Sequence, residues 1–334
     1  MSRSAVNGNT LFDLLVNPSW KLISAVAILL ALFAVAAAGL DGLLGGTPTD
    51  GDFRRQFIYP AMIIYILTIT RILTSYHDEE VTSLREISKI DDASFEARII
   101  ASDVMVRKGT PIALATGFVI GLLLASQWLL DETFAWLELY TALTSSVMFA
   151  LLLWVASLAL ADTRLIGGIE RQPLDFDILY RQPFIAIGRQ SLRVALAFVG
   201  GTTIAALFTI SPEEGFDLGD LLIYGVLILV TLLIFFLPMT QSHRILRAAK
   251  TKELDTVNRR LADAYGVLKG LSKDDQEGLL AFSTEVRLWK DYEDRLKSVN
   301  TWPYELGMLR TLLLSVLIPI VASQAQRLVA LWLA

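Results

Sequence analysis

The chain has 334 residues, of which 54% are hydrophobic and 19% charged, with a mean hydropathy of +0.53 and a formal net charge of −5. Such a composition excludes an ordinary soluble domain, because the apolar residues also come in long uncharged blocks. The absence of Cys excludes disulfides and Cys-ligated metals, and two histidines are too few for a His-rich zinc site.

Residues 1–21 precede the first apolar block, and we predict that they form an N-terminal interfacial segment. The run Thr10-Leu11-Phe12-Asp13 is typical of a helix start, and Pro18 follows soon after. We therefore expect a short helix along the inner membrane surface. No cleavable signal peptide is expected, because the first apolar block begins late and lacks an Ala-x-Ala site.

Six apolar blocks follow, and each approaches the roughly 17 to 25 residues that a helix needs to cross the hydrocarbon core. The blocks are 22–40, 56–76, 111–130, 139–161, 194–210 and 221–240. The second includes Arg71 near its end, from where the long side chain can reach the headgroups. We predict an all-α membrane protein whose six-helix transmembrane domain, 22–242, forms three hairpins with cytoplasmic loops at 77–108 and 162–193.

The distribution of basic residues predicts the orientation of the six spans. Apart from Arg54, Arg55 and Arg327, every Lys and Arg falls on the side that holds the N-terminus. The opposite side carries acidic turns around Asp131 and Glu213. By the positive-inside rule the basic side is cytoplasmic, so we expect a multi-pass protein of the plasma (inner) membrane with a cytoplasmic N-terminus.

Small residues recur every four positions in two odd-numbered spans, a spacing that favours close approach of membrane helices. They are Ala113, Gly117, Gly121 and Ala125 in the third span, and Ala197, Gly201, Ala205 and Thr209 in the fifth. From these stripes we expect the odd-numbered helices to form the inner layer and the even-numbered helices to face lipid.

Residues 243–301 have the pattern of two soluble helices. Apolar residues alternate steps of three and four from Leu254 to Leu271 and again from Leu279 to Trp289, and Gly270 separates the two stretches. We predict a cytoplasmic antiparallel helical hairpin with a coiled-coil seam. Such a hairpin is either a docking or oligomerisation stalk for a cytosolic protein partner, or a pair of helices that only caps the bundle.

Residues 302–334 form a C-terminal membrane segment that Pro319 interrupts. It is either a seventh span or a re-entrant or interfacial segment. One face of this segment collects small and polar residues: Ser315, Pro319, Ala322, Ser323 and Gln326. That face either lines a pore in a homo-oligomer or contacts another helix.

Two further groups are candidate sites. The run Gly200, Gly201, Thr202 and Thr203 lies inside the fifth span, where it either unwinds the helix and exposes carbonyls to an ion or serves close packing. The run His77, Asp78, Glu79 and Glu80, with Asp91 and Asp92 later, either attracts a divalent cation or consists of solvated acids.

No ionisable residue lies near the middle of the six spans, which disfavours a voltage sensor or a carboxylate-based proton carrier. Known phosphate, dinucleotide, zinc-protease and hydrolase motifs are absent, so we expect neither an enzyme nor a cofactor. The hairpin interleaves acids with bases, so no nucleic-acid binding is expected. Three functions remain: an oligomeric channel-like conduit gated by the hairpin, a membrane-anchored sensor or scaffold that binds a cytosolic partner, and a secondary transporter.

Overall fold

The computed structural model describes residues 11–43, 56–88, 91–129, 135–170, 177–179, 182–209, 218–270 and 276–333. Within them every regular element is a helix, so the predicted all-α fold is confirmed for this part of the chain. The helices are α1 (Leu11–Val16), α2 (Trp20–Leu43), α4 (Ile58–Ile87), α5 (Asp92–Leu129), α6 (Trp136–Glu170), α7 (Gln182–Thr209), α8 (Leu218–Gly270), α9 (Gln276–Ser298), α10 (Leu306–Ser315) and α11 (Ile318–Leu333).

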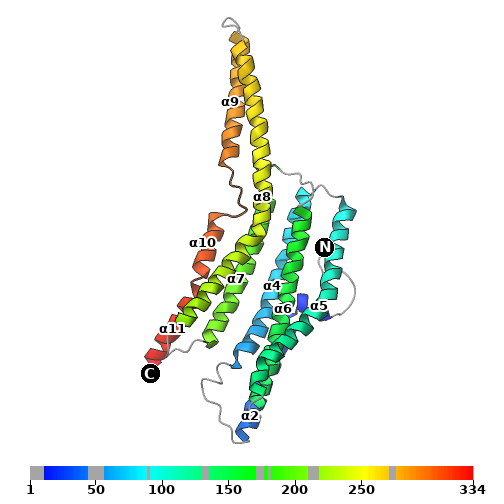
Figure 1. The fold of residues 1–334 in the computed structure, drawn as a ribbon, viewed down its shortest axis with the longest axis vertical. Helices are drawn as coiled ribbons and strands as arrows, with labels where there is room; N and C mark the ends of the chain where they lie inside the picture. Colours follow the sequence, from blue (N-terminus) through cyan, green and yellow to red (C-terminus); the bar gives the residue numbers. More distant parts are fainter. Residues whose placement is uncertain are drawn as a thin grey trace.

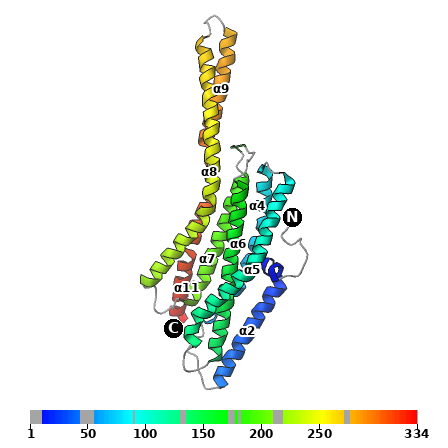
Figure 2. The same cartoon turned by 45° about the vertical axis from the view of Figure 1, so that its right-hand side comes forward.

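The helices form an elongated bundle from which one helical hairpin projects (Figure 1). α8 runs along the bundle and continues beyond it, and α9 returns alongside its outer half. α10 and α11 then follow α7 back toward the end of the bundle that lies away from the hairpin, as the second view also shows (Figure 2).

Six of these helices are long and apolar enough to cross a membrane, as predicted. Their outer surfaces are apolar as well: on α2, Ile28, Leu32 and Val35 are 61%, 65% and 71% exposed. Side chains of this kind over a whole helix face require a lipid environment, because water would disfavour them. The chain therefore has the architecture of a multi-pass membrane protein.

The helices extend well past the predicted membrane boundaries. The segments predicted as loops, 77–108 and 162–193, are largely helical, because α4 continues to Ile87, α5 begins at Asp92 and α6 continues to Glu170. A helix satisfies its own backbone hydrogen bonds in water as in lipid, so the end of an apolar block does not oblige the helix to end. Asp91 supports the start of α5, where its carboxylate accepts a hydrogen bond from the Ser94 amide at 2.9 Å.

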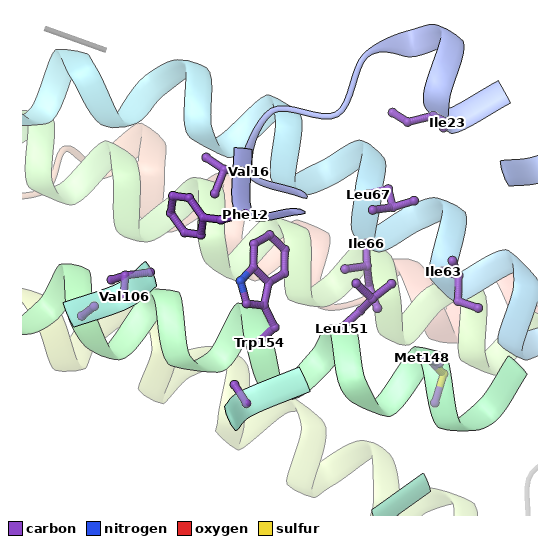
Figure 3. Close-up of a cluster of buried hydrophobic side chains, with 12 residues drawn as sticks. Phe12, Val16, Ile23, Ile63, Ile66, Leu67, Val106, Met148, Leu151 and Trp154 are labelled. Carbon is purple, nitrogen blue, oxygen red and sulfur yellow. The ribbon is translucent and has the colours of Figure 1, made fainter. Parts of the chain in front are cut away.

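The first helix packs against the bundle. Phe12 and Val16 of α1 are each 5% exposed and lie beside the fully buried Trp154 of α6 (Figure 3). Asp13 forms an ion pair with Arg107 of α5 at 3.0 Å. The apolar side of this helix thus packs against α4, α5 and α6, and its expected position along the inner membrane surface stays a prediction. Thr10 lies outside the described residues.

The small-residue stripe of α5 meets the backbone of α6. A Cβ at Gly117 would lie 2.5 Å from the Phe149 carbonyl oxygen, and one at Gly121 would lie 2.5 Å from the Ser146 Cα. The expected layering is wrong, however: in the apolar window of α6, an even-numbered span, 39% of the residues are buried, against 17% in α2. α6 contacts α2, α4 and α5, and its polar side chains can be buried there because their hydroxyls bond back to its own backbone. These side chains are Thr141, Thr144, Ser145 and Ser146.

Candidate functional site at the base of the hairpin

α8 physically joins the apolar bundle to the hairpin. It comprises 53 residues, which correspond to about 80 Å of helix, and it contains Pro238 near the end of its apolar part. Proline removes one backbone hydrogen bond and bends a helix without ending it when the surroundings hold both halves. A single helix that contains one proline therefore links the bundle to the hairpin.

The two helices of the hairpin are held together by a narrow apolar seam. Val257 and Leu261 of α8 and Leu296 of α9 are buried, with Val286 and Trp289 packed against them. At the base of the hairpin, the Lys250 ammonium donates to the carbonyl oxygens of Lys297 and Val299 at 2.8 and 2.7 Å. The last carbonyls of a helix have no partner within it, so Lys250 supplies one and fixes where α9 ends.

One carboxylate lies inside this seam. Glu293 is 6% exposed and accepts hydrogen bonds from the ammonium groups of Lys290, at 2.5 Å, and Lys297. The hydrogen bond from Lys290, and then that from Lys297, hold the pKa of Glu293 below its ordinary value of 4.5. Beside it, the Tyr292 hydroxyl donates to Glu253 of α8 at 3.2 Å, and burial raises the pKa of Tyr292. The Glu293 contacts lie within α9, whereas the Tyr292–Glu253 hydrogen bond joins α9 to α8 and so helps to set the register between the two helices.

The segment after α9 folds back onto α8. The Trp302 ring stacks on the His243 ring, with centroids 4.1 Å apart and planes inclined by 11°. The Nδ1 atom of His243 lies 3.2 Å from the Thr301 carbonyl oxygen, within hydrogen-bond distance. Trp302 and Tyr304 also contact Phe236 edge-on, so an aromatic cluster surrounds the point where α8 leaves its apolar stretch.

The same segment is pressed against α7 at Gly188. A Cβ at this position would overlap the carbonyl oxygen of Pro303, and Pro303 itself is buried. Nearby, the side chains of Phe184 and Ile187 are buried against Leu246 of α8. The sequence interpretation missed this junction because these residues fall in a stretch predicted as loop, where Phe184, Ile185 and Ile187 were the only hint of a core.

The side chain of Tyr65 fills the space beside the glycine pair of α7. A Cβ at Gly200 would overlap the Tyr65 hydroxyl, which donates to the Ala197 carbonyl at 2.5 Å. The ring of Tyr65 also lies against Gly201. Thr202 and Thr203 donate to the Val199 carbonyl, each at 2.8 Å, and α7 is continuous through all four residues. This geometry is that of close helix packing between α4 and α7.

The polar face of the C-terminal segment is divided between two helices. Ser315 ends α10, is buried and donates to the Leu312 carbonyl at 2.8 Å, while Pro319 lies in the first turn of α11, which begins at Ile318. Ala322 is half-buried, and the side chains of Ser323 and Gln326 lie outside the described part of the chain. α11 packs against α7, and whether this face lines a pore or contacts a helix stays a prediction.

The acidic candidates lie at the end of α4 and the start of α5. His77, Asp78, Glu79 and Glu80 belong to α4, and their side chains fall outside the description. Asp91 caps α5, and Asp92 forms an ion pair with Arg85. In the part of the chain that the structure describes, no three His, Asp or Glu residues are grouped to hold a metal ion. Hydrogen bonding from Ser94 lowers the pKa of Asp91.

Comparison of the chain with protein-family models, curated proteins and solved structures gave no match. The junction described above is therefore interpreted from its own geometry alone.

Proposed function

We propose that this protein is a membrane-anchored scaffold whose α8–α9 hairpin docks a cytosolic partner at a fixed position relative to the bilayer. The observation that carries the proposal is the double attachment of the hairpin. The first attachment is α8, which runs from the bundle into the hairpin as one helix. The other is the segment after α9, which packs on α7 at Gly188. A flexible tether needs neither, whereas a positioned arm needs both.

The outer half of the hairpin offers contact residues. Four large apolar side chains there are exposed: Tyr265, Val267, Leu280 and Leu288. Leu280 is the most exposed of them, at 69%. Given the register fixed by the Tyr292–Glu253 hydrogen bond, Tyr265 and Leu280 lie at the same level near the tip. An exposed tyrosine with apolar side chains beside it can form the buried centre of a protein interface, where aromatic residues are enriched.

We further propose the orientation that the charges favour, with the N-terminus and the hairpin on the cytoplasmic side of the plasma membrane. Arg244 and Arg247 follow the apolar part of α8 directly, as the positive-inside rule requires of a cytoplasmic boundary. On this view α10 and α11 form a broken seventh span, because they accompany α7 through the bundle (Figure 2).

The alternatives, an oligomeric conduit and a secondary transporter, have less support. The polar residues expected to line a path are partnered within the chain: Tyr65 fills the space beside Gly200, and the threonine hydroxyls bond to their own helix. A conduit would have to use the α11 face at Ser323 and Gln326 in an assembly of several copies.

A photo-crosslinking amino acid at Leu280 tests the docking proposal in the intact protein in its own membrane. We expect a covalent adduct with one cytosolic protein at Leu280 and none at the exposed control position Asp294, which lies near the base of the hairpin. Replacing residues 258–287 by a short glycine-containing turn leaves the junction in place and should abolish partner binding. Identical adducts at both positions, or partner binding that survives the shortened hairpin, would refute docking at the tip. Ion flux through liposomes containing only this protein would favour the conduit.

A further inference from the structure

The side of α8 that faces away from its neighbours is continuous from the apolar part into the charged part. Four apolar side chains, each more than half exposed, lie on it: Val226, Leu229, Leu233 and Leu237. Their spacing of three and four places them on one helix face. Arg244 follows Val226 after about five turns of helix and therefore lies on the same face.

A shallow hollow begins at this point. It is lined by residues of α8 alone: Arg244, Arg247, Ala248, Thr251, Lys252, Asp255 and Arg259. Four of these residues are basic, and Asp255 is the one acid among them. Among the described residues neither Arg244 nor Arg247 forms an ion pair, and both are exposed. The sequence interpretation overlooked this face because it considered the hairpin as a whole, in which acids and bases are interleaved.

The depth of the two arginines matches a lipid headgroup. The rise from Val226 to Arg244 is about 27 Å, close to the roughly 30 Å thickness of the hydrocarbon core. The stacked pair of His243 and Trp302 lies at the same level, and Trp favours the membrane interface. Arg244 and Arg247 are thus placed where phosphates lie, directly beyond a face that acyl chains cover.

We infer that this face of α8 binds an anionic phospholipid. The acyl chain lies along Val226 to Leu237, and the headgroup phosphate is held by Arg244 and Arg247, whose guanidinium groups suit phosphate oxygens. Lys252 and Arg259 lie farther from the membrane and extend the positive field, which Asp255 reduces. Basic clusters immediately beyond a membrane helix are typical of anionic-lipid recognition. The bound phosphate would lie beside the His243–Trp302 contact that ties the hairpin to its base.

Native mass spectrometry of the full chain, titrated with phosphatidylglycerol or phosphatidylcholine, tests the inference. Wild type should bind phosphatidylglycerol preferentially, and R244Q/R247Q should weaken that binding by roughly 10- to 30-fold. The variant R260Q/R287Q removes the same charge from exposed positions nearer the tip and should bind like wild type. Equal phosphatidylglycerol binding by wild type and R244Q/R247Q would overturn the inference and leave the basic face to an acidic soluble partner.

A second measurement holds even where the double variant fails to fold. The chain has no Cys, so Ala248→Cys and Asn258→Cys each carry a single fluorescent label. In bilayers with headgroup-spin-labelled lipid at equal mole fraction, phosphatidylglycerol should quench the label at position 248 more than phosphatidylcholine does. The label at position 258, about 15 Å farther along α8, should show no such preference. Equal quenching by both lipids at position 248 would also overturn the inference.

Discussion

Gly188 of α7 and Pro303 of the segment after α9 lie so close that a Cβ on the glycine would overlap the Pro303 carbonyl oxygen. This contact joins residues more than a hundred positions apart in the sequence. It closes a ring that passes from α7 through α8, up and down the hairpin, and back to α7. The hairpin is therefore held at both ends of its base.

The first prediction concerns this contact. Gly188→Ala should destabilise the protein by about 1 to 3 kcal/mol, because the atom that must move belongs to the backbone rather than to a flexible side chain. Thermal melting in detergent, followed by tryptophan fluorescence, measures the effect. Gly266→Ala in the hairpin is the matched control, since a Cβ there meets nothing within 4 Å, and it should be neutral or stabilising. Equal melting temperatures of the two variants would show that the backbone at Pro303 moves aside without a cost in stability.

The second prediction concerns the α5–α6 contact. Gly121→Val should separate the two helices and lower the melting temperature, because the obstructing atoms are the Cα of Ser146 and its neighbouring backbone. Gly109→Val in the same helix is the control, since open space surrounds that glycine. If both variants have the same melting temperature, the small-residue stripe on α5 does not determine how closely α5 and α6 approach.

The third prediction concerns a helix cap supplied from another helix. The carboxylate of Asp41, near the end of α2, accepts hydrogen bonds from the Trp136 and Leu137 amides at 2.8 and 2.9 Å. Asp41 is 8% exposed, so water replaces it poorly. Asp41→Ala should cost about 0.5 to 2 kcal/mol, and Asp41→Asn should recover part of the loss because the amide oxygen still accepts. Identical melting of both variants and wild type would contradict this role.

The fourth prediction concerns pH. The pKa of Glu293 is lower in the folded hairpin than its ordinary value of 4.5, because Lys290 and Lys297 stabilise the carboxylate. Its contribution to stability is therefore fully present above pH 4.5 and is lost as the pH falls through the folded pKa.

Glu293→Gln should consequently weaken the hairpin at neutral pH and reduce its further loss of stability in acid. Hydrogen exchange of the α9 amides, corrected for the intrinsic effect of pH, measures this. Asp263→Asn removes one acidic group at an exposed position of α8 and should leave α9 protection unchanged. Equal acid sensitivity in wild type and Glu293→Gln would rule out the carboxylate as the source.

Hydrophobic blocks and helix periodicity were sufficient to predict the all-helical fold and the six apolar helices, because both depend on neighbours within a few turns, but not how far the helices extend beyond the apolar blocks. Gly117 and Gly121 were recognised as packing residues for the same reason. Their partner was not predictable, since spacing along one helix says nothing about which helix lies opposite. The expected inner layer of odd-numbered spans failed because hydroxyls that bond back to α6 make that helix suitable for burial.

The candidate site was less predictable than the fold. The contacts at Gly188, Asp41 and Lys250 each depend on where the chain returns after a long excursion, and no local pattern encodes that. The basic face of α8 was predictable in principle: projected on a helix of 3.6 residues per turn, Arg244 and Arg247 fall in line with Leu233 and Leu237. It was missed because the charges of the whole hairpin were considered together, and the acids from Glu253 onward balance the uninterrupted bases between Arg244 and Lys252.

The most direct test of the account uses membrane-impermeant maleimide on two single-cysteine variants of this Cys-free chain in intact cells. Leu43→Cys lies at the far end of α2 from its start at Trp20, and Leu280→Cys lies near the hairpin tip. The account predicts that Leu43→Cys is labelled from outside, whereas Leu280→Cys is labelled only after the cells are permeabilised. Labelling of Leu280→Cys in intact cells would contradict a cytoplasmic hairpin and, with it, the proposed docking of a cytosolic partner.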